Sequence, residues 1–264
     1  MPQQSDSTAY VALVTGASRG IGRVIAMQLA ERGVRIALHY RNNRKAAEAT
    51  LADLKGTGHS LVDADLADAA AATDLWQRVV KQHDAVDILI NNAGVYMMHA
   101  PLATNYASWQ SAWQRTIGAN LIAPANLSLL AAQSMAARIN PLNAAFGRGR
   151  IVNISSRGAF RGEPDAPAYG ASKAGLNALS QCLAKSLAPN AIYVYCVAPG
   201  WVETEMAASH LTGPDGPAIL AQHPLGRVNR PDEVAAAAVY CALDAPPAMT
   251  GGVIDVNGAS YLRT

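Results

Sequence analysis

The chain has 264 residues, of which 50% are hydrophobic and 15% are charged, and its formal net charge is +2. This length suits one domain with a large core, and the near-balanced charge gives no support to a nucleic-acid or membrane-surface role. No apolar stretch approaches the roughly 18 residues that a membrane-spanning helix needs. Residues 1–8 are polar and lack the pattern of a signal peptide, so we expect a flexible tail there and a single domain over 9–264.

Short apolar or β-branched runs alternate with helix-length segments along the chain. The runs span 11–15, 35–40, 60–65, 87–91, 150–155, 192–197 and 253–256. Most of them are continuously apolar, which is typical of parallel strands that are buried on both faces. Between the runs, Ile21, Ile25 and Leu29 share one helical face, and a leucine stripe over 176–187 ends before Pro189. We predict an α/β, single-domain, doubly wound (Rossmann) fold with a sheet of about seven parallel strands flanked by helices.

One long segment, 207–230, shows no clear pattern and contains Gly213-Pro-Asp-Gly-Pro217. A long segment of this kind is either a mobile lid over a substrate site or a surface loop.

The cysteines Cys182, Cys196 and Cys241 are widely spaced and form no C-x-x-C pair. An odd number without partner histidines argues against a disulfide framework and against a metal site. We expect three buried, inert thiols in a reducing, cytoplasmic setting.

A glycine-rich turn, Thr15-Gly-Ala-Ser-Arg-Gly-Ile-Gly22, follows the first predicted strand and precedes the first predicted helix. Glycines let a backbone approach a ligand closely, and the helix behind them presents its N–H groups and the positive end of its dipole. The order predicts a pyrophosphate site, although glycine-rich turns also occur for purely structural reasons.

Small and polar residues follow three later strands, in Asn91-Asn-Ala-Gly94, Ser155-Ser156 and Ala198-Pro-Gly200. Ligands bind at the carboxyl ends of parallel strands, although each of these short segments alone fits a plain turn.

Tyr169 and Lys173 are four residues apart, so a helix places both on one face. A nearby ammonium group lowers the pKa of a phenol from about 10, and a tyrosine of lowered pKa suits acid catalysis of carbonyl reduction. Ser156 is suited to hydrogen-bond the substrate oxygen, whereas an isolated Tyr-x-x-x-Lys is usually a surface pair.

Taken together and in this order, the motifs resemble the short-chain dehydrogenase/reductase family over roughly residues 9–262. The resemblance implies a catalytic tetrad of Asn120, Ser156, Tyr169 and Lys173, with Tyr169 as acid or base, Lys173 on the nicotinamide ribose and Asn120 supporting a proton-relay water. It implies cofactor contacts from Gly16, Ser18, Arg19, Gly20, Ile21, Gly22, Arg41, Asp65, Leu66, Asn92, Ala93, Gly94, Tyr169, Lys173, Pro199, Gly200, Val202 and Thr204. No metal is implied.

Charge indicates which cofactor is preferred. The second predicted strand ends at Tyr40 and Arg41, where relatives specific for NAD carry an acid for the ribose 2′-hydroxyl. Arg41 and Arg19 are suited to clamp a 2′-phosphate, unless both are solvated surface residues. We therefore predict NADP(H) rather than NAD(H).

The predicted function is reduction of a ketone to a secondary alcohol, or the reverse, and the leading specific hypothesis is a 3-oxoacyl thioester reductase. The alternative is a sensor or scaffold of the same fold that binds NADP(H) without turnover. The family resemblance implies a dimer or tetramer packed through helices at roughly 109–137 and 169–187. His99 and His223 are expected to be structural or solvated. The substrate, the direction of the reaction, the product stereochemistry and any acyl-carrier partner are left open.

Overall fold

The computed structural model describes residues 10–139 and 141–263, so the predicted tail at 1–8 lies outside the described residues. The strands form one seven-stranded sheet in the order β3-β2-β1-β4-β5-β6-β7. Every neighbouring pair is parallel. The strands are β1 (Val11–Val14), β2 (Arg35–Tyr40), β3 (Ser60–Asp63), β4 (Ile88–Asn91), β5 (Gly149–Ile154), β6 (Ile192–Pro199) and β7 (Val253–Val256). The predicted doubly wound parallel sheet is confirmed.

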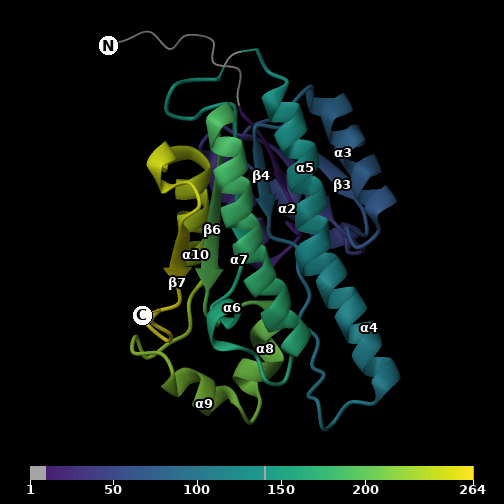
Figure 1. Ribbon diagram of the computed structural model, residues 1–264, viewed down its shortest axis with the longest axis vertical. Helices are drawn as coiled ribbons and strands as arrows, with labels where there is room; N and C mark the ends of the chain where they lie inside the picture. Colours follow the sequence, from purple (N-terminus) through teal and green to yellow (C-terminus); the bar gives the residue numbers. More distant parts are fainter. Residues whose placement is uncertain (1–9, 140, 264) are drawn as a thin grey trace.

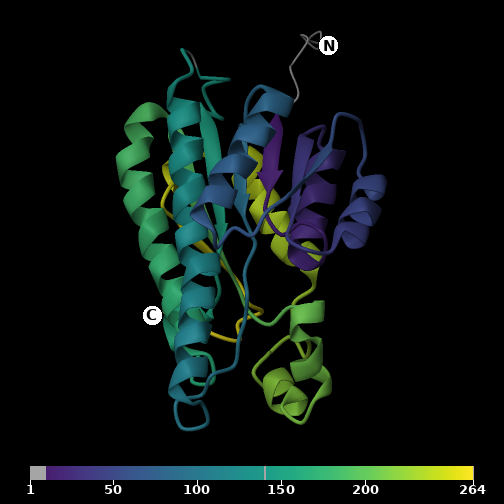
Figure 2. The same cartoon turned by 90° about the vertical axis from the view of Figure 1, so that its right-hand side faces the viewer.

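Helices cover both faces of this sheet (Figures 1 and 2). One face carries α1 (Gly20–Glu31), α2 (Arg44–Asp53) and α10 (Pro231–Val239). The other carries α3 (Ala69–His83), α4 (Tyr106–Ile117), α5 (Ala123–Ala136) and α7 (Pro167–Leu187). Successive residues of β1 serve opposite sides, because Ala12 and Val14 pack in the first core and Leu13 in the second. This is why the strands read as continuous apolar runs.

The strand order reverses between β1 and β4. The crossovers after β1 and after β4 therefore run in opposite directions, which opens a crevice at the carboxyl ends of these two strands. The glycine-rich turn after β1 and the Asn-Asn-Ala-Gly segment after β4 both lie at this crevice.

A π-helical segment, Gly118–Ile122, joins α4 to α5 and carries Asn120. Such bulges turn side chains away from the regular helical direction and often occur at functional sites. Other short segments are α6 (Gly158–Arg161), the 3₁₀ turns Ala188–Asn190 and Pro247–Met249, and the π-helical Tyr240–Asp244.

The segment 207–230 is more ordered than its sequence indicated. Half of it lies in two short helices, α8 (Glu205–Thr212) and α9 (Gly216–Ala221), which sit beyond the carboxyl ends of the strands (Figure 2). The backbone of Gly216 donates to Gly213, so the Gly/Pro-rich stretch forms the turn between the helices.

One prediction about the cysteines is wrong. Cys196 and Cys241 are buried, but Cys182 is exposed. The buried side of α7 runs through Leu176, Ser180 and Ala184, and Cys182 faces away from it because its position is half a turn removed.

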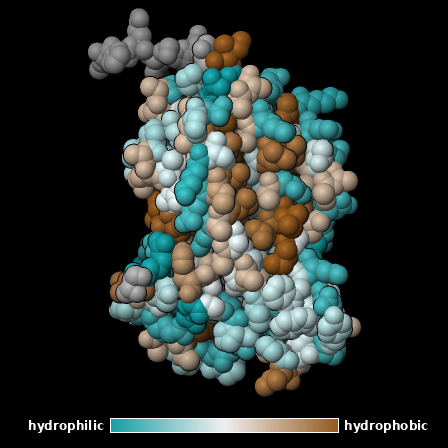
Figure 3. All heavy atoms as spheres, viewed as in Figure 1, coloured by the Kyte–Doolittle hydropathy of each residue, from teal (hydrophilic) through white to brown (hydrophobic). Residues whose placement is uncertain are grey.

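The outer surface of the α4, α5 and α7 layer is partly apolar (Figure 3). Exposed side chains there include Tyr106 on α4, Ile122 in the π-helical segment and Leu129 on α5. Within residues 10–139 and 141–263, no helix has the length and apolar character needed to cross a membrane.

Candidate active site

The turn between β1 and α1 needs glycine at particular positions. Gly16 and Gly20 have positive φ values of 63° and 55°, which side-chain-bearing residues rarely adopt. A Cβ at Gly22 would lie 2.5 Å from the carbonyl oxygen of Gly16, so this helix position must also stay bare. No side chain caps the first turn of α1, and its N–H groups point toward the crevice as an anion site requires.

The Asn-Asn-Ala-Gly segment braces this turn from the neighbouring strand. The Thr15 hydroxyl accepts from the backbone N–H groups of Asn92 and Ala93, both at 2.9 Å, and donates to the Ile90 carbonyl at 3.1 Å. The Asn92 amide donates to the Thr15 carbonyl at 2.9 Å. The carboxyl ends of β1 and β4 are therefore held together by side-chain hydrogen bonds as well as by the sheet.

His39, near the end of β2, ties the turn to β3 and was not singled out from the sequence. Its Nδ1 accepts from the Gly16 N–H at 3.0 Å, and its Nε2 lies 3.1 Å from the Ala64 carbonyl. The pairing defines a neutral ring that carries its proton on Nε2. Burial lowers the pKa of His39 to about 4, in agreement with that neutral form.

Lys173 enters the site from α7 and is 4% exposed. Its Nζ donates to the Ile154 carbonyl at 2.8 Å, at the end of β5. Burial lowers the pKa of Lys173 to about 8. Ser156 follows the same strand, and its Oγ accepts from the Gly158 N–H at 3.0 Å.

Tyr169 lies one helical turn before Lys173 and is half-buried. The predicted lowering of its pKa is wrong for this arrangement. Burial raises the pKa of Tyr169 to about 12, and the Ser156 hydroxyl offsets only part of that rise. The Lys173 ammonium lies 5.8 Å from the centre of the Tyr169 ring and is engaged by the Ile154 carbonyl. Tyr169 is therefore a neutral phenol at physiological pH, in position to donate a proton.

Asn120 is fully buried and braces the segment after Gly94. Its Oδ1 accepts from the Val95 N–H at 2.8 Å, and its Nδ2 donates to the Val95 carbonyl at 3.0 Å. Nδ2 also lies 3.2 Å from the Ser172 hydroxyl, which links this segment to α7.

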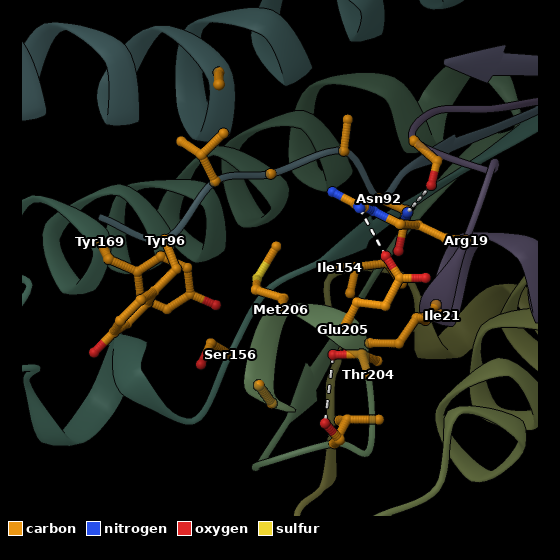
Figure 4. Close-up of a pocket in the computed structure, with 18 of the residues that line it drawn as sticks. Arg19, Ile21, Asn92, Tyr96, Ile154, Ser156, Tyr169, Thr204, Glu205 and Met206 are labelled. Atoms are coloured by element: carbon orange, nitrogen blue, oxygen red, sulfur yellow. Dashed lines mark hydrogen bonds and ion pairs between the residues drawn. The ribbon is translucent and has the colours of Figure 1, made fainter. Parts of the chain in front are cut away.

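These groups surround one cavity of about 390 Å³. Figure 4 shows Tyr96, Tyr169 and Ser156 at one end and Arg19 with Glu205 at the other, with Met206 between them. All the predicted catalytic and cofactor residues line the cavity except Gly22 and Asn120, which lie behind its wall. Lining residues that sequence analysis did not assign to catalysis or cofactor binding include His39, Asn42, Asn43, Tyr96, Arg115, Glu163, Trp201, Glu205, Met206 and His210.

The cavity end near β2 carries several cations. Arg41 lines it and is exposed. Arg19 pairs with Glu205 of α8 at 2.7 Å, with both side chains more than half exposed. Arg115 Nη1 contacts both oxygens of Asp65, at 2.9 and 2.8 Å. A bare glycine turn with two arginines beside it fits a phosphate-rich dinucleotide.

An aromatic wall forms the other end. Tyr96 packs edge-on against Tyr169, with ring centres 5.0 Å apart, and against His210 of α8 at 5.6 Å. The ring centre of Trp201 lies 5.4 Å from that of His210. Helix α8 thus contacts both ends of the cavity, through His210 here and Glu205 at the cofactor end.

The expected structural role of His99 fits its contacts. Its Nε2 accepts from the Ala168 N–H at 3.1 Å in the first turn of α7, directly before Tyr169. Its Nδ1 pairs with the Met97 carbonyl at 2.8 Å. In the described ranges, no three His, Cys, Asp or Glu side chains are grouped so that they could hold a metal ion.

Comparison with known proteins agrees with this architecture. The family model described as enoyl-(acyl carrier protein) reductase matches residues 16–259. The 3-oxoacyl-[acyl-carrier-protein] reductase FabG of Staphylococcus aureus is 34% identical over 253 residues, covering 95% of this chain and 98% of that protein. The 3-oxoacyl-[acyl-carrier-protein] reductase of Synechocystis is 33% identical, with coverages of 97% and 98%.

A solved structure is similar over the same length. A putative gluconate dehydrogenase from Agrobacterium tumefaciens superposes with a TM-score of 0.84, at 29% identity and 97% coverage of both chains. The chain therefore belongs to the short-chain dehydrogenase/reductase family and is an oxidoreductase.

Proposed function

We propose that the chain interconverts a ketone and a secondary alcohol with NADP(H), and that Tyr169 is the proton donor or acceptor. The observation that carries the proposal is the convergence of Ser156, Tyr169 and Lys173 at one end of a cavity whose other end is the glycine-rich turn. The dinucleotide supplies or accepts the hydride when it is bound.

The chain's own residues account for the proton and the charge. Tyr169 holds its proton, because its pKa is about 12, and gives it to the substrate oxygen as negative charge develops there. Ser156 donates a hydrogen bond to the same oxygen. Lys173 is suited to hold the nicotinamide ribose, and its pKa of about 8 leaves it mostly protonated at neutral pH. Asn120 is suited to position the relay water by bracing Val95 and α7.

Preference for NADP(H) is supported by Arg19 and Arg41 at the cavity end near β2. Tyr40 ends β2, so no carboxylate there would repel a 2′-phosphate. Arg41→Ala should weaken NADPH binding while leaving NADH binding unchanged. Equal affinities of the wild type for NADPH and NADH would count against it.

The names of the relatives suggest two substrate classes for testing, 3-oxoacyl thioesters and polyhydroxy acids. The aromatic wall and Met206 give the cavity an apolar lining that suits an apolar chain.

We further propose that α8 and α9 act as the substrate lid within 207–230. The apolar outer surface of α4 and α5 supports a dimer or tetramer, and a single species near 27.6 kDa in light scattering would contradict it. The cysteine content favours the cytoplasm.

The deciding experiment measures oxidation of NADPH and NADH with a 3-oxoacyl thioester, an aromatic ketone, a keto sugar and a diketone. Wild type and Tyr169→Phe are compared. We expect NADPH-dependent turnover that the substitution abolishes. NADPH binding without Tyr169-dependent turnover in either direction would instead favour the non-catalytic sensor.

A further inference from the structure

The Glu163 carboxyl group lines the substrate end of the cavity and has no part in the proposed proton transfer. It lies in the segment between α6 and α7 and is half-buried. A Cβ added at Gly158 would lie 2.5 Å from Glu163 Oε1, so the side chain rests directly on that glycine. Gly158 is also the residue whose N–H donates to Ser156. The carboxyl group is thereby held close to the reacting end.

Glu163 lines the same cavity as Tyr96 and Tyr169. Burial is the main cause of the raised pKa of both phenols, and the charge of Glu163 adds to it. The Glu163 side chain therefore lies at the end of the cavity where we propose that the substrate's reacting carbon binds.

Glu163 differs from the other two acids that line the cavity. Asp65 is paired with Arg115 and Glu205 with Arg19. Among the described residues, the Glu163 carboxylate makes no ion pair within 4.0 Å and accepts no hydrogen bond; Arg161 and Arg157 act on it only through longer-range charge. The carboxylate is only half-buried and water still reaches it, so a ligand that displaces this water must supply a donor in its place.

The charges around Glu163 limit which group of a ligand could donate a hydrogen bond to it. A carboxylate accepts hydrogen bonds and cannot donate them, so it favours a donor on the ligand and repels a second carbonyl oxygen. Arg157 lines the cavity and Arg161 lies beyond it, so these charges oppose an ammonium group. A neutral hydroxyl group satisfies both conditions.

We infer that Glu163 accepts a hydrogen bond from a hydroxyl group close to the reacting carbon, so that hydroxylated ketones are preferred over 3-oxoacyl thioesters. This inference rests on the proposed carbonyl reduction. Ser156 and Tyr169 serve the reacting oxygen, Glu163 serves its hydroxylated neighbour, and the second carbonyl of a 3-oxoacyl thioester faces the carboxylate without a donor.

The test compares NADPH-dependent kcat and KM for 1-hydroxy-2-hexanone, for 2-hexanone, which lacks only the hydroxyl group, and for the N-acetylcysteamine thioester of acetoacetate. Hydrogen bonds to charged groups are worth enough to give a preference of about ten- to hundredfold in kcat/KM. We expect the wild type to show that preference, Glu163→Leu to lose it, and Glu163→Gln, which keeps an acceptor, to retain part of it. The matched control Asp165→Asn removes an exposed charge two residues away and should leave the preference unchanged.

Other results would contradict the role of Glu163 or the proposed function. If Glu163 only supports the loop or balances the arginines, Glu163→Leu will lower activity on both hexanones equally, and the inference is wrong. NADPH affinity, measured by fluorescence, reports whether each variant is folded. The comparison of the two hexanones in the wild type does not depend on the folding of any variant. Tyr169-dependent turnover without a hydroxyl preference removes this inference and leaves the proposed function standing. Absence of any turnover overturns both.

Discussion

Acid should destabilise this protein because burial lowers the pKa of His39, His83 and His223, and the lowering is largest at His39. His39 is 2% exposed and holds two backbone segments together only while its ring is neutral. Protonation of Nδ1 would remove the acceptor for the Gly16 N–H and place a charge in the core. The structure therefore predicts a loss of stability that starts near the pKa of an exposed histidine.

The size of the effect follows from the change in pKa. Burial lowers the pKa of His39 from 6.5 to about 4. Between these values the unfolded chain binds the proton more tightly than the folded chain, so stability falls as the pH falls. One pKa unit corresponds to about 1.4 kcal/mol, and the linkage relation gives a loss of about 2 kcal/mol in unfolding free energy between pH 7 and pH 5.

Urea unfolding at pH 7 and pH 5 measures this loss. In His39→Asn the side-chain oxygen still accepts from Gly16 but does not titrate, so the variant should lose about 2 kcal/mol less than the wild type. The matched control is His59→Asn, the same substitution at a half-buried histidine that also accepts a backbone N–H at 3.0 Å, from Ile36; His39→Asn should reduce the loss more, because His39 is the more deeply buried ring. Equal losses in wild type and His39→Asn would refute the reasoning.

Three further outcomes are expected. Lys173→Met should abolish reductase activity yet raise the unfolding free energy at pH 7 by about 2 kcal/mol in urea titration, because burial disfavours the ammonium below pH 8 and the lost hydrogen bond offsets about 1 kcal/mol. Its stabilising effect should shrink as the pH rises from 8 toward 10.5. Gly22→Ala should cost about 1–3 kcal/mol and weaken NADPH binding in fluorescence titration, because its methyl group meets the glycine-rich turn and Asn92. Glu205→Gln should release Arg19 and tighten NADPH binding about two- to fivefold at low salt, but not NADH binding, since the pair is exposed and worth less than about 1 kcal/mol.

The sheet was predictable because most of its strands are buried on both faces. Short apolar or β-branched runs marked all seven strands, and the errors lie at their ends. Thr15 lies just beyond the end of β1, where its hydroxyl accepts from the N–H groups of Asn92 and Ala93. These bonds join residues 77 and 78 positions apart, and no local pattern records them. The extension of β6 to Pro199 likewise depends on pairing with β7.

The helical spacing of Tyr169 and Lys173 correctly predicted a shared position on α7, but it did not predict their electrostatics. Spacing along a helix gives proximity between two side chains and says nothing about the strand end beneath them. The Ile154 carbonyl takes the Lys173 ammonium, and burial then dominates the pKa of both groups in opposite directions. Tyr169 is therefore a neutral phenol with a raised pKa, whereas the spacing had predicted a lowered pKa.

His39 and Glu163 were not predicted from the sequence for the same reason. His39 lies inside an apolar run, and Glu163 lies in a connection, so neither belongs to a motif. A usable signal did exist for His39, because a polar ring in a strand buried on both faces must find hydrogen-bond partners. Glu163 offered none, since its position depends on the bare Gly158 beneath it. The residues proposed to bind the cofactor therefore lie in motifs that the sequence displays, whereas the residue proposed to select the substrate lies in a connection whose course only the folded chain defines.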